Sequence, residues 1–113
     1  MTLTGNEGVP FSQLVPASQT DTVYAWAFSK TTLESFDISA ATGTGATTTI
    51  KFYNGVSLLL TVVLADGMSM HWDLDLFNAN NTVAPKWFAS DVTSVKITTT
   101  DASTVNGNAV VIV

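Results

Sequence analysis

The clearest pattern in the chain is a strict alternation of apolar and polar residues between Met68 and Leu76. Methionine, tryptophan and leucine occupy every second position, and serine, histidine and aspartate occupy the positions between them. A period of two places successive side chains on opposite faces of a β-strand, whereas a helix would scatter these apolar residues around its axis. The segment is therefore predicted to be a strand with one buried face and one solvated face.

Two more strands are predicted directly before this one. Residues 47–53 alternate in the same way, and residues 56–64 form a continuous apolar run, which is typical of a strand covered on both faces. An Asn-Gly dipeptide at 54–55 separates the two runs, and Asp-Gly at 66–67 follows the second. Both dipeptides supply the positive φ angles of tight turns. We expect three consecutive antiparallel strands, the first two joined by a two-residue Asn-Gly loop.

Weaker alternation predicts further strands elsewhere. They are residues 22–28, 34–39, 92–99 and 108–113. Residues 83–90 contain Pro85, so we expect an edge strand or a loop that covers the core there. Residues 40–46 are rich in glycine, alanine and threonine, and we expect a connector that crosses between two sheets. The sequence thus predicts an all-β fold, an antiparallel β-sandwich or jelly roll of about eight short strands.

The first twenty residues differ from the rest of the chain. Residues 1–20 contain two glycines, two prolines and isolated apolar side chains, so we predict an extended N-terminal arm that precedes a single β-sandwich domain over residues 21–113. A frayed terminus with an edge strand is the ordinary interpretation of such a segment. The alternative is an arm that docks on a neighbouring subunit through Val9, Phe11 and Leu14.

Composition narrows the classes of function. The 113 residues and 11.9 kDa suit one domain, and 46% hydrophobic against 12% charged residues disfavours intrinsic disorder. Four lysines, no arginine and nine carboxylates give a net charge of -5, which argues against binding nucleic acid or an anionic membrane surface. No apolar stretch approaches the roughly 20 residues of a membrane helix, and no signal peptide is recognised at the N-terminus. The absence of cysteine excludes disulfides and thiolate metal sites.

The candidate chemistry is sparse. His71, Asp73 and Asp75 lie on one face of a predicted strand, but successive same-face residues are about 6.5–7 Å apart, too far to converge easily on one metal ion. We interpret them as a solvated face. His71 is the only histidine, and neither Ser57 nor Ser69 lies in a nucleophile-elbow sequence. We therefore expect a protein that is not an enzyme, with no catalytic residue, no cofactor and no metal site.

The three tryptophans have two interpretations. Trp26, Trp72 and Trp87 would suit an aromatic platform for sugar rings, but large aromatic side chains are more often buried in a core. Trp72 lies on the apolar side of its strand, which favours the core. Trp87 follows Pro85 in a predicted loop and is the best candidate for an exposed aromatic contact with a partner, although burial is again the ordinary expectation.

The overall pattern resembles the small jelly-roll structural proteins of tailed bacteriophage virions, in particular capsid decoration (cement) proteins. The resemblance covers roughly residues 20–113. It is carried by TTTIKFYNGVSLLL at 47–60, the Asp-Gly turn leading into MSMHWDLDL at 68–76, the Trp-Phe pair at 87–88, and the segment from Asn-Gly at 106–107 to VVIV. The resemblance implies a homotrimer on the outer surface of the virion capsid, bound to the major capsid protein, with no cofactor and no catalysis.

Three functions follow as hypotheses. The first is a decoration protein, made in the host cytoplasm, that bridges and stabilises capsid subunits through several weak contacts at once. Its expected partner-binding residues are Val9, Phe11, Leu14 and Trp87. The alternative is a glycan- or receptor-binding module of a fibre or adhesin, which would use Trp87, Tyr53 and polar loop residues at 78–81. A third is another virion component, such as a head–tail connector.

Overall fold

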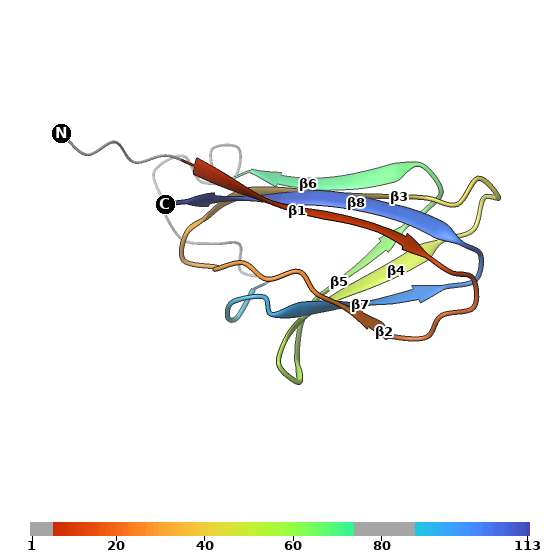
Figure 1. Ribbon diagram of the computed structural model, residues 1–113, viewed down its shortest axis with the longest axis horizontal. Helices are drawn as coiled ribbons and strands as arrows, with labels where there is room; N and C mark the ends of the chain where they lie inside the picture. Colours follow the sequence, from red (N-terminus) through yellow and green to blue (C-terminus); the bar gives the residue numbers. More distant parts are fainter. Residues whose placement is uncertain (1–5, 74–87) are drawn as a thin grey trace.

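The protein is a sandwich of two antiparallel sheets (Figure 1). The structure, a computed structural model, describes residues 6–73 and 88–113, and these residues form strands and connections without a helix. The strands are β1 (Asn6–Val15), β2 (Thr22–Tyr24), β3 (Leu33–Ala41), β4 (Thr48–Asn54), β5 (Ser57–Leu64), β6 (Met68–Asp73), β7 (Ser94–Thr99) and β8 (Ser103–Ile112). One sheet has the order β1-β8-β3-β6 and is called sheet A. The other, sheet B, has the order β2-β7-β4-β5.

The strand order is that of a jelly roll. The first strand pairs with the last, the second with the seventh, the third with the sixth, and the fourth with the fifth. The chain is thus one long antiparallel hairpin, wound up so that alternate pairs fall into opposite sheets. Added pairs between β3 and β8 and between β4 and β7 complete the two sheets. The predicted all-β sandwich of about eight strands is confirmed.

Two turns differ from their predictions. In the β4–β5 hairpin Asn54 pairs with Ser57, so the two-residue loop is Gly55-Val56 rather than Asn-Gly. Gly55 has a φ of 56°, and glycine at the first central position is the pattern of a type II′ turn. The turn at Asp66-Gly67 leads out of sheet B and into sheet A, so β5 and β6 are not ladder partners. Alternation identified the strands correctly but carries no information about which strand pairs with which.

The strand β5 was expected to be buried on both faces, and this prediction is wrong. β5 is the last strand of sheet B. Val62 and Leu64 point into the core, but Leu58 and Val63 are 52% and 59% exposed. A continuous apolar run does not distinguish a covered strand from an edge strand whose outward side chains are also apolar. The packing of the core therefore does not explain why these outward side chains are apolar.

The predicted N-terminal arm is a strand over the residues that the structure describes. β1 pairs with β8 along its whole length, from Asn6 opposite Ile112 to Val15 opposite Ser103. It forms an edge of sheet A, as the ordinary interpretation of an edge strand anticipated. The sandwich therefore extends to at least Asn6, and residue 20 lies in the connection between β1 and β2 rather than at a domain boundary. The apolar stretch 110–112 is paired within β8, as predicted.

The core between the sheets is built on aromatic rings. Trp26 stacks on Phe11 with ring centroids 5.2 Å apart, and its Nε1 donates a hydrogen bond of 2.9 Å to the carbonyl of Val9. The indole also lies against Gly107 of β8, where a Cβ would come within 2.8 Å of the ring and 2.6 Å of the Asp37 carbonyl. Phe28, Phe36, Phe52 and Phe88 continue the ring contacts. Trp26 is therefore a core residue that joins sheet A to the segment after β2.

At the other end of the core, a polar contact joins the two sheets. Thr48 of β4 and Ser103 of β8 are fully buried, and their hydroxyl oxygens are 2.7 Å apart. Among the described residues every buried side-chain nitrogen and oxygen has a hydrogen-bond partner. Buried polar groups are costly unless they are paired in this way.

Candidate functional site

Of the four predicted partner-binding residues, Leu14 is the one that the structure places on the surface. Its side chain is 66% exposed on β1. Phe11 is 6% exposed and belongs to the core, which contradicts its predicted role in docking on a neighbour. Val9 is half-buried against the core, and its carbonyl accepts the Trp26 hydrogen bond. Trp87 lies outside the described residues. Because β1 is paired within sheet A, its inward side chains pack in the core and do not face a partner.

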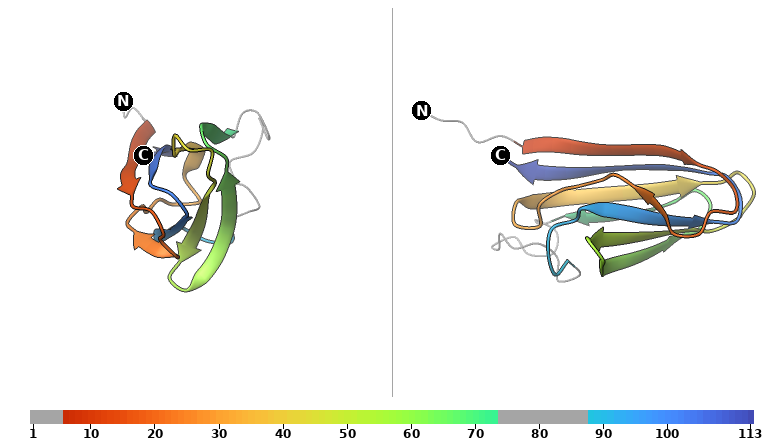
Figure 2. Two further views of the ribbon diagram at one scale, coloured as in Figure 1. Left: turned by 90° about the vertical axis from the view of Figure 1, so that its right-hand side faces the viewer. Right: turned by 60° about the horizontal axis from the view of Figure 1, so that its bottom comes forward.

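Several exposed apolar side chains near β5 form a surface that the sequence pattern did not predict. Val56, Leu58, Val63 and Met68 are each more than half exposed, and Val56 is 95% exposed. They lie on β5, at the start of β6 and in the β4–β5 turn, on the lateral side where both sheets end (Figure 2). We call these four residues the β5–β6 side. Exposed apolar side chains gathered along one side of a soluble protein are candidates for an interaction site.

The β5 strand is also an edge in the hydrogen-bonding sense. One side of its backbone pairs with β4 from Thr48 opposite Leu64 to Asn54 opposite Ser57. On its other side the structure places no ladder partner among residues 6–73 and 88–113. Natural proteins usually blunt such edges with charges, proline or bulges. β5 has an irregularity in register opposite Phe52 and Tyr53, but it contains no charged residue and no proline.

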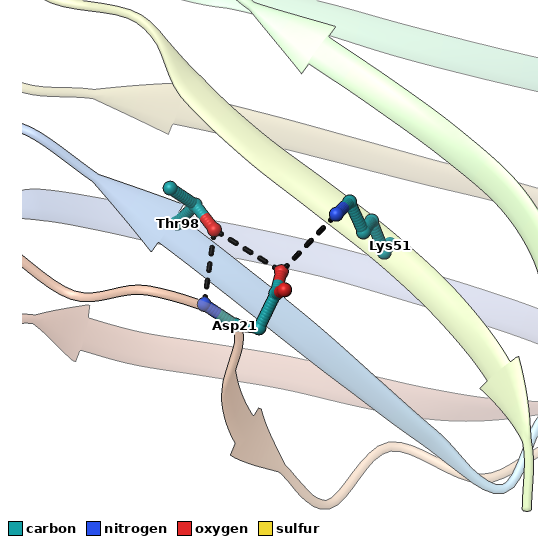
Figure 3. Close-up of polar contacts among 3 residues, drawn as sticks. All are labelled: Asp21, Lys51 and Thr98. Atoms are coloured by element: carbon teal, nitrogen blue, oxygen red, sulfur yellow. Dashed lines mark hydrogen bonds and ion pairs between the residues drawn. The ribbon is translucent and has the colours of Figure 1, made fainter. Parts of the chain in front are cut away.

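Beside β5, the outer face of sheet B carries two lysines that are already engaged. The Nζ of Lys51 is 3.2 Å from Oδ1 of Asp21, and Thr98 accepts from the Asp21 amide at 3.0 Å and donates to its Oδ1 at 3.2 Å (Figure 3). The hydrogen bond from Lys51 lowers the pKa of the Asp21 carboxyl, so this group stays ionised near neutral pH. Lys96 lies 4.3 Å from the centroid of the Tyr53 ring. The positive charge next to β5 is therefore partly neutralised within the molecule.

The outward side chains of β6 on sheet A are polar. His71 and Asp73 lie on the outer face of the sheet with Nε2 and Oδ2 3.6 Å apart, and Asp37 of β3 is directly opposite His71. Asp75 lies outside the described residues. No group of three histidine, aspartate or glutamate side chains within the described part is placed to hold a metal ion. His71 is exposed and Asp73 is half-buried, in keeping with the predicted solvated face.

The connector between β3 and β4 is fixed by one carboxylate. Asp66 accepts hydrogen bonds from the backbone N–H groups of Thr42 at 2.9 Å and Gly45 at 3.2 Å. A hydrogen bond from the Gly43 backbone, followed by those from Thr42 and Gly45, lowers the pKa of the Asp66 carboxyl. The connector crosses from sheet A to sheet B, as predicted. The glycines of the connector are therefore part of a turn with a structural role.

Comparison with known proteins gives a likeness in fold. A solved structure described as "Bacillus endospore appendages form a novel family of disulfide-linked pili" is similar to this chain, with a TM-score of 0.54 and 23% sequence identity. The match covers 96% of this chain and 85% of that one. No protein-family model and no curated protein matches the chain. The described part of the chain also has no helix of the length and apolarity needed to cross a membrane.

Proposed function

We propose that this protein is a non-enzymatic structural subunit that adheres to other protein subunits of a larger assembly. The observation that carries the proposal is the β5–β6 side, where apolar side chains that the core does not need lie in solvent. Burying one valine, leucine or methionine contributes about 1.5–3 kcal/mol, so a few such contacts give a weak interface. Several weak interfaces made at once give a strong assembly.

Decoration of the outer surface of a phage head is the specific form of this function that the sequence pattern favours. A jelly roll with a net charge of -5 would avoid the packaged nucleic acid and adhere to the major capsid protein at the outer surface of the head. Leu14 remains a candidate contact from the predicted set. The homotrimer implied by the resemblance belongs only to this phage-specific form of the proposal.

A fibre subunit is the second candidate. It is favoured by the likeness to the pilus structure and by the position of two long edge strands, β1 and β5, on opposite sides of the sandwich (Figure 2). A contact between opposite sides repeats without closing and builds a filament. Because these 113 residues contain no cysteine, such a filament would hold together without disulfides from this chain.

Glycan binding has less support among the described residues. Trp26 and Trp72 are buried, and Lys96 lies over the half-exposed ring of Tyr53. Sugar-binding platforms require an open aromatic face.

Two measurements on the purified chain test the proposed function. Light scattering after size-exclusion chromatography, combined with negative-stain electron microscopy, is expected to give a mass above 11.9 kDa or visible assemblies. Titration with a panel of sugars is expected to leave tryptophan fluorescence unchanged. A monomer up to about 1 mM that binds a sugar would overturn the proposal, since that concentration corresponds to only about 4 kcal/mol of association free energy.

A further inference from the structure

Among the four edge strands of the sandwich, β5 is the one that is both long and without charge or proline. β1 contains Glu7 and Pro10, β6 contains Asp73, and β2 has only three residues. An edge of eight residues made of Ser, Leu, Thr and Val is a template for a further strand. The question is which strand covers it.

We propose that β5 pairs with β5 of a second copy of this chain, in antiparallel orientation about a two-fold axis. The inference rests on the proposed function, because it names the partner of the β5–β6 side. Sheet B of the two copies then becomes one continuous sheet of eight strands, twice the four of each copy. The contact is isologous, so it closes after two copies.

Charge favours a second copy at this edge. Two molecules that each carry -5 repel one another, so their contact must be free of like charge. Residues 57–64 carry none. The nearest cation in register is Lys51 on β4, opposite Thr61, and it is paired with Asp21. In the dimer the two β4 strands are three strand spacings apart, about 14 Å, which exceeds the Debye length of about 8 Å at physiological salt.

The strand is also self-complementary. A two-fold axis at Thr61 places Leu60 opposite Val62 of the second copy, and both of these residues pack on the core side of sheet B. Thr61, which is exposed on the outer side, then lies opposite itself. Val63, which is exposed on the same outer side as Thr61, lies diagonally across from Thr61 of the second copy. Each copy thus covers apolar surface on the other while the backbone edges complete their hydrogen bonds.

The other long edge is a poorer partner for β5. Pro10 has no N–H to donate to a neighbouring strand. The carbonyl of Val9 is already bonded to the indole of Trp26. A head-to-tail contact between β1 and β5 would therefore lose hydrogen bonds that the contact between two β5 strands keeps.

Single cysteines test the register, because the chain has no cysteine of its own. In Thr61→Cys the two sulfurs face each other across the axis, and directly opposed Cα atoms about 4.5–5.5 Å apart suit a disulfide. Mild oxidation is expected to give a species of twice 11.9 kDa that reduction returns to the monomer. Leu14→Cys, at another exposed position on β1, is the matched control and is expected to stay monomeric.

A charge substitution tests the contact without any crosslink. Wild-type protein is expected to show twice the monomer mass in light scattering, and Val63→Lys is expected to raise the dissociation constant at least about tenfold by placing a charge in the apolar contact. Leu14→Lys makes the same change on the opposite side and is expected to leave the mass unchanged. Both side chains are exposed, so circular dichroism is expected to show the wild-type fold in each variant.

Several outcomes overturn this inference. They are a trimer or fibre that Val63→Lys leaves intact, a disulfide that forms only when Thr61→Cys and Leu14→Cys are mixed, and a wild-type monomer up to about 1 mM. The first two results would leave the proposed structural function standing, with a different contact. The third, accompanied by a fluorescence response to a sugar, would remove both.

Discussion

The two long edges of the sandwich differ in how they meet solvent. On β1, Glu7 adds a charge, Pro10 removes a donor, and the Trp26 indole binds the Val9 carbonyl. β5 has an irregularity in register opposite Phe52 and Tyr53 but no charge and no proline, and Leu58 and Val63 point outward. The β1 edge is thus protected by residues of the same molecule, whereas the β5 edge exposes apolar side chains and an unpaired backbone. Since unprotected edges carry a risk of aggregation, β5 is the edge that the proposed partner would cover.

The largest expected effect comes from removing the side chain that closes the β1 edge. Trp26→Ala deletes a buried indole from its stack on Phe11, and such truncations cost about 3–5 kcal/mol of unfolding free energy. Urea denaturation measures the loss, and hydrogen exchange is expected to show faster exchange of β1 amides.

Trp26→Phe separates packing from hydrogen bonding at the same position. It keeps a ring against Phe11 but loses the donor to Val9, so its additional cost from the hydrogen bond is expected to be about 0.5–1.5 kcal/mol. If Trp26→Phe were as destabilised as Trp26→Ala, the ring packing would not be the main contribution of this residue.

The edge strand β5 allows a buried and an exposed leucine to be compared within one strand. Leu64→Ala removes a buried side chain and is expected to cost about 2–5 kcal/mol, whereas Leu58→Ala removes an exposed one and is expected to lie within about 0.5 kcal/mol of the wild type. The unfolding free energies of dilute, monomeric protein check both values. A large loss in Leu58→Ala under those conditions would mean that the fold itself needs the outward side chains.

The smallest expected effect concerns acid stability near the β1–β2 connection. The pKa of Asp21 is lowered in the folded state, chiefly by the hydrogen bond from Lys51. The folded state therefore binds fewer protons here than the unfolded state, so the contribution to stability is present above the ordinary value of about 4 and is lost as pH falls through the lowered folded value.

The Asp21→Asn variant checks this direction. Thermal unfolding between roughly pH 7 and pH 2 is expected to fall less steeply in Asp21→Asn than in the wild type. Lys51→Met, which removes the cation instead, is expected to flatten the same part of the profile. An unchanged acid slope in both variants would contradict the role assigned to this ion pair.

Much of the fold was predictable because strand periodicity is local. The alternation around Trp72 and Ile50 identified β6 and β4, and the apolar segment at 110–112 identified part of β8. The jelly-roll class followed from many short strands separated by turn residues. Strand pairing was harder to predict from the sequence, because β5 and β6 are adjacent in sequence yet lie in different sheets.

The exposed apolar β5–β6 side could not be predicted either, because it also depends on which strands pair. A run such as residues 57–64 is read as buried, and only its position at the end of sheet B shows that half of its side chains face outward. Phe11 is predicted to contact a partner because the glycines and prolines of residues 1–20 favour an extended arm, whereas the pairing of β1 with β8 places its side chain in the core. Both errors come from contacts between segments that are distant in the sequence.

The pairing of the first strand with the last has a consequence for biosynthesis. While a ribosome is still making the chain, the hairpin of β4 and β5 can form, since both strands and their turn are local. β1 must wait until β8 has been made, because β8 is the strand with which it pairs. Such nonlocal pairing folds in milliseconds to seconds. The growing chain therefore exposes its unpaired β5 edge before its core is complete. At that stage the concentration of partly folded chains decides whether they fold productively or associate prematurely.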